Sequence, residues 1–397
     1  MDVRIKPGKL SGKLTAVSSK SDAHRVLIAA ALCDGKTDVY INNISQDIEA
    51  TLRCIKAFGG NYEIKSGFIT VYPFKKTDMA VADCGESGTT ARFILPVAAT
   101  RCENFVLEGS GRLPQRPFTE LIREMRNSGV KINQDHLPIS CTGQLNTKKE
   151  FLMEGNVSSQ YISGLLFAIA GNGGEGEIKL TSPLESAGYV DMTVDTLKTF
   201  GITVLKGEKF YFVEKGKLKS PGKIWVEGDW SNAAFWRAAK FLGSDVALDG
   251  LEKTSLQKDR EIENLLPLPD VVDAKDIPDI IPILCVAAAG MEKTTRFVNT
   301  KRLKIKESDR AKATCDLINN LGGNARFDDN SITILGKGFL EGGEVESFND
   351  HRIAMSAAIA ATICKKEVII KDAYCVKKSY PAFYEDFKKL GGQVNDI

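Results

Sequence analysis

One stretch decides the fold of this chain: SKSDAHRVLIAAAL, residues 19–32. A polar start followed by an apolar, alanine-rich run predicts a helix with a capped start and a buried body. The start of such a helix offers unpaired N–H groups and the positive end of the helix dipole. Lys20 adds a cation there, and Ser21 and Arg25 stand four residues apart on one helical face. Read alone, the stretch predicts an anion site or, with equal weight, a solvated helix start.

The same kind of helix start recurs along the chain at near-regular spacing. The further starts are Gly88-Thr89-Thr90, Ser158-Ser159-Gln160, Ser231-Asn232, Pro278-Asp279 and Asn349-Asp350-His351-Arg352. Any single one is common in proteins that bind nothing at such a position. Because basic and polar residues gather at all but the fourth, the set indicates a small ligand with more than one negative group.

Amphipathic helices that end in glycine form a second repeat. These glycines are Gly59, Gly129, Gly201, Gly322 and Gly391. Glycine suits the left-handed position that closes a helix. The spacing is roughly 70 residues, except for one double interval in which a unit has lost its glycine near residues 262–265. Alternating strand-like sequence at residues 67–71, 209–213 and 331–335 completes a repeated α/β unit.

Six such units divide into two α/β domains of three units each. The joint is expected in the segment at residues 220–229, which contains proline and glycine. We expect a first domain at residues 13–226 and a second domain made of residues 1–12 and 227–397. The first strand is assigned to the second domain because the first capped helix begins only at residue 20.

The bulk composition excludes several classes of protein. With 397 residues and 43% hydrophobic content, the chain can build two full cores. The net charge of +2, without a block of like charge, argues against a nucleic-acid partner. Nine cysteines without a CxxC pair indicate reduced thiols, and three histidines without a cluster argue against a metal site. No signal segment or membrane span is predicted, so we expect a soluble, cytoplasmic protein.

Four further segments carry candidate chemistry. The Gly-rich turn at residues 84–92 opens a helix but lacks the Lys of a nucleotide-binding P-loop. The loop at residues 112–117 holds two arginines and two prolines, and either arginine could grip a carboxylate or lie on the surface. At residues 304–310 we expect a helix start that brings Lys306, Asp309 and Arg310 onto one face, with Glu307 beside them. A carboxyl group among cations is either a structural ion pair or an acid/base group.

Taken in order, these segments resemble the family of 5-enolpyruvylshikimate-3-phosphate synthases over about residues 5 to 390. The resemblance rests on nine segments in order with fitting gaps: Lys20-Ser21 with Arg25, Ser87-Gly88-Thr89 with Arg92, Arg112 to Pro117, Ser158-Ser159-Gln160, Ser186 with Tyr189, Ile277-Pro278-Asp279, Lys306 to Arg310, Asn349 to Arg352, and Lys378.

The resemblance implies a fold and a reaction. The fold is an inside-out α/β barrel of the enolpyruvyl transferase type, with two domains of three repeated units and the active site in the interdomain cleft. The site is expected to assemble when the domains close. The reaction transfers the enolpyruvyl group of phosphoenolpyruvate to the 5-hydroxyl of 3-phosphoshikimate and releases phosphate. The resemblance implies no metal or organic cofactor. We also expect no nucleic-acid partner, no membrane partner, and a monomer.

The resemblance also implies roles for individual residues. Asp279 takes the hydroxyl proton and Glu307 protonates the enol methylene, while Lys20 and Lys378 stabilise developing charge. The residues implied to hold phosphoshikimate are Lys20, Ser21, Arg25, Ser158, Ser159, Gln160, Ser186, Asp279 and Lys306. Those implied to hold phosphoenolpyruvate are Lys20, Gly88, Arg116, Gln160, Arg310, Arg352 and Lys378.

Three positions depart from the family pattern, and three other readings remain. Glu86 replaces a frequent Asn, Ala187-Gly188 replaces a basic-Pro pair, and Arg302 replaces a frequent Asn, which bears on inhibitor response and affinity. The nearest rival is the sister transferase acting on UDP-N-acetylglucosamine, which usually carries a reactive Cys on the loop matching residues 109–117, where this chain has none. An RNA-end-processing enzyme would need a nucleotide site and a basic groove. A non-catalytic phosphate-binding protein would not need both Asp279 and Glu307.

Overall fold

The computed structural model describes all 397 residues, which divide into two compact units. The central unit is one continuous segment, Lys20–Val226, and the terminal unit combines Met1–Ser19 with Glu227–Ile397. The boundary at residue 12/13 expected from the sequence lies too early. Strand β2 (Ser11–Thr15) runs through that point and pairs in parallel with β15 (Asp245–Asp249), so residues 13–19 belong to the terminal unit.

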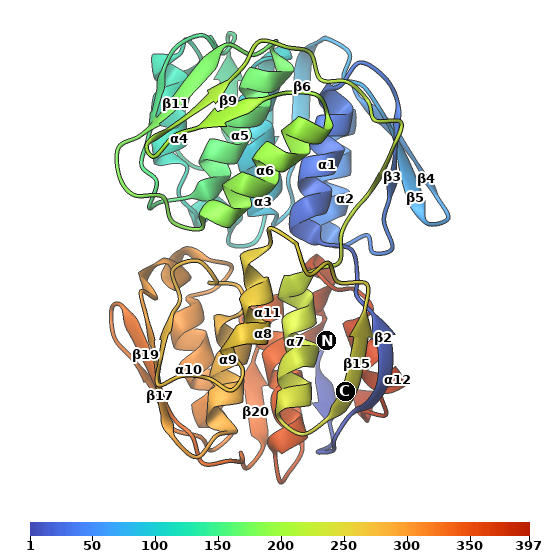
Figure 1. Cartoon of the computed structure of the whole chain (residues 1–397), viewed down its shortest axis with the longest axis vertical. Helices are drawn as coiled ribbons and strands as arrows, with labels where there is room; N and C mark the ends of the chain where they lie inside the picture. Colours follow the sequence, from blue (N-terminus) through green and yellow to red (C-terminus); the bar gives the residue numbers. More distant parts are fainter. The chain divides into compact units, whose positions relative to one another are not determined.

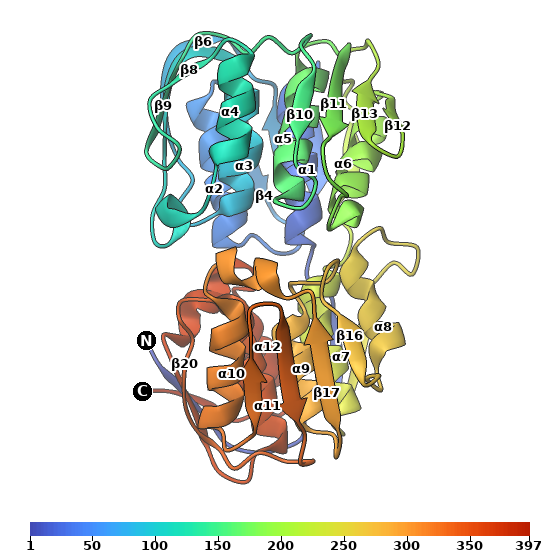
Figure 2. The same cartoon turned by 90° about the vertical axis from the view of Figure 1, so that its left-hand side faces the viewer.

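Three four-stranded sheets form the outside of the central unit (Figures 1 and 2). The first has the order β14 (Lys223–Trp225), β3 (Thr37–Tyr40), β5 (Phe68–Tyr72), β4 (Asn61–Lys65). The second has the order β6 (Thr77–Asp83), β7 (Cys102–Glu108), β9 (Ile139–Thr142), β8 (Lys131–Ile132). The third has the order β10 (Phe151–Met153), β11 (Gly176–Leu180), β13 (Phe210–Val213), β12 (Val204–Lys206). In each, the first two strands are parallel and the other neighbours are antiparallel.

Two sheets of the terminal unit repeat this pattern, and its third sheet has only two strands. One sheet has the order β16 (Val271–Asp273), β17 (Thr294–Val298), β19 (Ser331–Leu335), β18 (Ala325–Phe327). Another has the order β20 (Gly343–Glu346), β21 (Val368–Lys371), β1 (Val3–Ile5), β22 (Val394–Asp396). The third consists only of the parallel pair β15 and β2. Of the six repeated α/β units, the one expected to have lost its helix-closing glycine near residues 262–265 therefore also lacks the antiparallel strand pair.

Each unit buries three helices almost completely inside its sheets. In the central unit these are α1 (Lys20–Leu32), α3 (Gly88–Ala98) and α5 (Ser159–Gly171). In the terminal unit they are α7 (Trp230–Phe241), α9 (Ile281–Ala289) and α11 (His351–Ala360). Every residue of α9 is buried, because its sequence is apolar on all sides. No helix combines the length and the apolar character needed to cross a membrane.

The other helices each leave part of their surface exposed. They are α2 (Gln46–Ala57), α4 (Thr119–Asn127), α6 (Ala187–Thr199), α8 (Ile262–Leu265), α10 (Arg310–Asn320) and α12 (Phe383–Lys389). Short 3-10 turns lie at Leu113–Gln115, Lys258–Glu261, Lys301–Ile305, Ala361–Ile363 and Ala373–Lys378. The five predicted helix-closing glycines are confirmed, since all have positive φ, between 79° for Gly322 and 102° for Gly129. The three predicted strands are confirmed as β5, β13 and β19.

Candidate functional site

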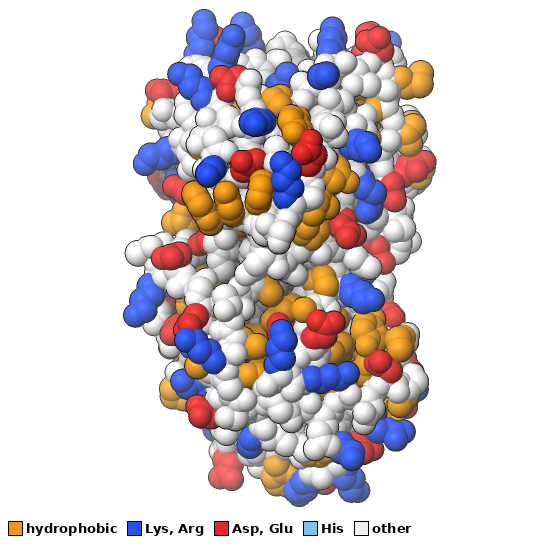
Figure 3. All heavy atoms as spheres, turned by 90° about the vertical axis from the view of Figure 1, so that its right-hand side faces the viewer, with side chains coloured by type: hydrophobic (Ala, Val, Ile, Leu, Met, Phe, Trp, Pro, Cys, Tyr) orange, Lys and Arg blue, Asp and Glu red, His pale blue; other side chains and the backbone are white.

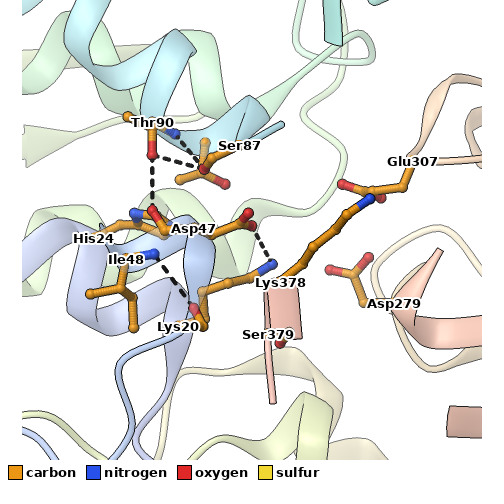
Figure 4. Close-up of polar contacts among 12 residues, drawn as sticks. Lys20, His24, Asp47, Ile48, Ser87, Thr90, Asp279, Glu307, Lys378 and Ser379 are labelled. Carbon is orange, nitrogen blue, oxygen red and sulfur yellow. Dashed lines mark hydrogen bonds and ion pairs between the residues drawn. The ribbon is translucent and has the colours of Figure 1, made fainter. Parts of the chain in front are cut away.

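The start of α1 carries Lys20 and Arg25 in two different environments. The Lys20 ammonium forms an ion pair with Asp47 of α2 at 2.9 Å, and both side chains are 13% exposed (Figure 4). Arg25 is buried one turn later, where it donates from Nε to Thr193 Oγ1 at 2.9 Å and from Nη2 to the Tyr189 carbonyl at 2.7 Å. Burial lowers the pKa of Arg25 to about 10, so it stays charged at neutral pH. The predicted i, i+4 proximity is confirmed, because Arg25 Nη1 also donates to the Ser21 carbonyl.

The start of α3 is built around the close approach of Gly88 and Arg116. Ser87 caps the helix, with its hydroxyl accepting from the Thr90 N–H at 3.2 Å. A Cβ at Gly88 would lie 2.7 Å from Arg116 Nη1, so only glycine lets the guanidinium lie against this helix end. Of the two arginines in the proline loop, Arg116 is buried and Arg112 is exposed.

Arg92 of α3, for which the sequence predicts no role, links α3 to the start of α5. Gln160 accepts from Arg92 Nη1 at 2.7 Å and donates to Thr89 Oγ1 at 2.8 Å. Ser158 caps α5 by accepting from the Gln160 N–H at 3.3 Å, and Ser159 is buried beside it. Arg92 is held over the Phe118 and Tyr161 rings at 5.4 and 5.6 Å.

Ser186 stands just before α6 in a left-handed conformation, with φ 55°. Its carbonyl accepts from the Tyr189 N–H at 3.1 Å. The carbonyl of Tyr189 in turn accepts from Arg25. The central unit thus connects Ser186 to Arg25, and separately connects Gln160 to Arg92 and Gly88 to Arg116.

In the terminal unit, Arg310 joins three carboxylates. Its guanidinium is 1% exposed and forms ion pairs with Asp279 at 2.5 Å, Glu307 at 2.6 Å and Asp350 at 2.8 Å. Lys306 forms a second pair with Asp279 at 3.3 Å. Asp350 is fully buried, whereas the side chains of Asp279 and Glu307 are 21% and 22% exposed.

The charges in this cluster set one another's ionisation. Burial alone would raise the pKa of Asp279, but Lys306, Arg310 and Arg352 hold it well below its ordinary value. Burial lowers the pKa of Lys306, against the attraction of Asp279. Asp279 is therefore an ionised carboxylate at neutral pH, ready to accept a hydrogen bond.

Arg352 and Lys378 lie on the segments that follow. Arg352, in the first turn of α11, donates to Asn232 Oδ1 at 3.1 Å, and Lys378 donates to the Asn349 carbonyl at 2.7 Å. In Figure 4 the side chain of Lys378 extends toward the carboxylate of Glu307, and Asp279 faces the same point. The structure thus gathers Asp279, Lys306, Glu307, Arg310 and Lys378 in one place.

Three helix starts differ from the sequence-based expectation. Helix α10 begins only at Arg310 with Asp309 as its cap, so Lys306 and Glu307 lie in the preceding loop and not on a helical face. Helix α7 is capped by Asp229 and not by Ser231, which is inside its first turn. Asp279 precedes α9, whose first residue is Ile281, and so does not cap it.

Sequence reasoning missed several residues of the site. Asp47, Asp350 and Asp259 were not assigned roles, although Asp350 stands in a quoted motif. Asp259 is buried and accepts from the Ser231 hydroxyl. Burial, followed by the charge of Asp279, raises the pKa of Asp259 to about 7. Only the spacing of Asp47 behind the cap Ser45 gave a signal that could have found one of them.

Known proteins of one family match this chain over nearly its whole length. The family model described as EPSP synthase (3-phosphoshikimate 1-carboxyvinyltransferase) matches residues 5–268 and 260–387. The 3-phosphoshikimate 1-carboxyvinyltransferase of Clostridium perfringens is 38% identical over 417 residues, which cover 98% of each chain. That of Clostridium acetobutylicum is 38% identical over 422 residues, covering 99% of this chain and 98% of the relative.

Two solved structures share the fold of this chain. The EPSP synthase of Acinetobacter baumannii matches over 100% of both chains with a TM-score of 0.81 and 26% identity. The enolpyruvyl transferase NikO of Streptomyces tendae matches with a TM-score of 0.80 over 99% of this chain and 98% of its own, at 17% identity, which supports the fold alone.

Proposed function

The chain belongs to the EPSP synthase (3-phosphoshikimate 1-carboxyvinyltransferase) family, and we propose that it performs the family reaction with the residues described above. It transfers the enolpyruvyl group of phosphoenolpyruvate to the 5-hydroxyl of 3-phosphoshikimate and releases phosphate, a step of the shikimate pathway to the aromatic amino acids. The assignment of roles rests on one observation: the buried Arg310 guanidinium forms ion pairs with two partly exposed carboxylates, Asp279 and Glu307.

Asp279 and Glu307 have separate tasks in this proposal. Addition forms a bond between the 5-oxygen and C2 of phosphoenolpyruvate, while Asp279 takes the hydroxyl proton and Glu307 protonates C3. Elimination then returns a proton from C3 to Glu307 and expels phosphate. An anion bound at Arg310 would compete with Glu307 for the guanidinium, and its negative charge would favour the neutral acid form that Glu307 needs.

Most residues of the site are assigned to one of the two substrates, and two residues are assigned to both. In the terminal unit, Arg310, Arg352 and Lys378 bind phosphoenolpyruvate, and Lys306 with Asp279 binds phosphoshikimate. In the central unit, Gly88 N–H and Arg116 bind phosphoenolpyruvate, and Lys20 and Gln160 touch both substrates. The remaining central residues bind phosphoshikimate: Ser21, Arg25, Ser158, Ser159 and Ser186. A cytoplasmic monomer belongs to this proposal and is checked by light scattering and fractionation.

Two other functions fit the observations less well. Figure 3 shows Lys and Arg side chains interspersed with Asp and Glu over the face it presents, rather than gathered in a basic stripe for RNA. A phosphate-binding protein would have no use for two partly exposed carboxylates beside its cations. Transfer to a UDP-sugar remains the alternative that activity measurements separate.

The first test is phosphate release with each substrate alone and with both. We expect release only when phosphoenolpyruvate and 3-phosphoshikimate are present together. Activity with UDP-N-acetylglucosamine and none with phosphoshikimate would contradict the assignment.

The second test separates catalysis from binding at Glu307. Glu307→Gln keeps the size of the side chain and a hydrogen bond but removes the acid, so turnover should fall by roughly 10²-fold or more. Phosphoshikimate affinity should change little, because Glu307 is not among the residues assigned to bind phosphoshikimate. Glu341→Gln, in an exposed ion pair with Lys365 at 3.1 Å, is the matched control and should turn over normally. Normal turnover of the Glu307 variant would reduce that residue to a structural ion-pair partner.

A further inference from the structure

Three helix starts of the central unit are linked by buried hydrogen bonds that the mechanism above does not use. His24 of α1 bonds through Nδ1 to Thr51 Oγ1 of α2 at 2.7 Å. Thr51 Oγ1 lies 2.7 Å from Thr90 Oγ1 of α3, which contacts Ser87 Oγ at 2.8 Å. The four side chains are at most 1% exposed. We call His24, Thr51, Thr90 and Ser87 the relay.

The relay and the ion pair at Lys20 form a closed ring. Thr90 Oγ1 also donates to the Asp47 carbonyl at 3.3 Å, and the Asp47 carboxylate pairs with Lys20 at 2.9 Å (Figure 4). Lys20 stands one turn before His24 on α1, and Asp47 stands one turn before Thr51 on α2. Each of these helices is therefore held at two levels, which fixes both its rotation and its position along the axis.

Counting protons gives the relay a direction. Thr90 Oγ1 has a single proton, which it donates toward Ser87 Oγ at 2.8 Å and the Asp47 carbonyl at 3.3 Å, so none is left to donate to Thr51. Thr51 must then donate to Thr90, and His24 must donate from Nδ1 to Thr51. In the reverse direction, the single proton of His24 would sit on Nε2, which has no hydrogen-bond partner in the buried interior. An orphaned N–H costs more than an orphaned lone pair, so the first direction is favoured.

The environment of His24 agrees with a neutral ring. Burial, together with the charges of Lys20 and Arg25, lowers its pKa well below the ordinary value. A neutral imidazole with a proton on Nδ1 can serve as a fixed donor at the end of the relay. A charged ring would need a partner for Nε2–H, and none is present.

We propose that His24, Thr51 and Thr90 are positioning residues that hold the starts of α1, α2 and α3 in register, with His24 in the Nδ1–H tautomer. Through them the Lys20 ammonium and the Gly88 N–H keep fixed places for an anionic substrate. The assignment of Lys20 and Gly88 to substrate rests on the proposed function, whereas the relay itself rests on the hydrogen bonds.

The tautomer is tested by nitrogen-15 NMR of histidine-labelled full-length protein at neutral pH. The chain has only three histidines, and His24→Asn, which keeps an N–H donor near the Nδ1 position, identifies the His24 signal by its disappearance. We expect a protonated Nδ1 and a bare Nε2 in the wild-type protein. A proton on Nε2 in place of Nδ1 would overturn the relay, and this result requires no variant to fold.

The positioning role is tested by steady-state kinetics of variants. Thr51→Val removes both hydroxyl bonds and should lower kcat/KM for phosphoenolpyruvate roughly tenfold, while Thr51→Ser should restore it to within about twofold. Thr295→Val is the matched control, because Thr295 is a buried threonine of the terminal unit whose hydroxyl has no partner. It should leave kcat/KM unchanged even if its melting temperature shifts.

The outcomes separate the two proposals. A Thr51→Val protein with normal kcat/KM and a lowered melting temperature would show that the relay is only structural. Absence of turnover in the wild-type protein would count against the proposed function, whereas the His24 tautomer in the same sample would still decide the relay.

Discussion

At the scale of single residues, the terminal unit concentrates charge in a buried place at a cost that only mutual pairing offsets. Burial would lower the pKa of Arg310, but Asp350, Glu307 and Asp279 raise it well above its ordinary value. Removing one partner of a buried charge pair typically costs about 3–5 kcal/mol, because the other charge is left uncompensated. A ligand anion that binds the Arg310 guanidinium would replace one or more of these carboxylates as its partner.

Asp259 gives a pH prediction for this unit. Its pKa in the folded protein is raised to about 7, so between its ordinary value of 3.8 and about 7 the folded protein binds the proton that the unfolded chain releases. Its contribution to stability therefore decreases as pH rises through this window, and the penalty is fully present above it. Asp259→Asn removes this titration. The difference in free energy of unfolding between the variant and the wild type should therefore be roughly 1–3 kcal/mol more favourable to the variant at pH 8 than at pH 4. Urea unfolding at both pH values measures this, and a difference that does not vary with pH would contradict it.

At the scale of elements, the inner helices approach one another closely where their sequences allow it. Gly164 of α5 faces the backbone of α3, and a Cβ there would lie 2.3 Å from the Arg92 carbonyl oxygen. No rotamer change can relieve a clash with backbone. The α3–α5 contact therefore depends on the absence of a side chain at this position.

Gly164→Ala should accordingly lower the free energy of unfolding by about 1–3 kcal/mol, despite the better helix propensity of alanine. Gly8→Ala is the control, because a Cβ at Gly8 would meet nothing within 4 Å. Thermal melting of both variants measures the difference. Equal melting temperatures would mean that α3 and α5 separate at little cost.

The sequence predicts elements better than it predicts contacts. Glycines with positive φ and alternating strands are local signals, so the six repeated units could be read from spacing alone. The helix-start signal at Asp47 could mark the residue but not its pairing with Lys20, and Asp350 could not be assigned because its partner Arg310 is distant in sequence. The start of α10 was placed too early because Lys306 and Glu307 fit a helical face as well as the loop that they form. The first domain boundary was also placed too early, at residue 12/13, because the sequence of β2 gives no sign of its partner β15.

At the scale of the whole molecule, the two units differ in how the chain builds them. All strands of the central unit's sheets come from within Lys20–Val226, and this segment has its own hydrophobic core. The terminal unit takes β1 and β2 from the first residues of the chain and everything else from residues after 227.

A fragment of residues 20–226 should therefore fold alone, with cooperative thermal melting by circular dichroism. A fragment of residues 227–397 lacks the strands that pair with β15, β21 and β22, and should aggregate or stay partly unfolded. Linking residues 1–19 to its C-terminus through a flexible linker should rescue it. A fully folded 227–397 fragment would show that β1 and β2 are dispensable.

The position of β1 also fixes an order of events during synthesis. Val3–Ile5 leaves the ribosome well before Val368–Ile370 and Val394–Asp396, the two segments with which it pairs. At about 5–20 residues per second, this strand waits roughly 20 to 80 s for its neighbours. The newborn chain must keep this strand unpaired while the central unit completes, so the emergence of the strands at Val368–Ile370 and Val394–Asp396 sets the moment at which the terminal unit can close its sheet.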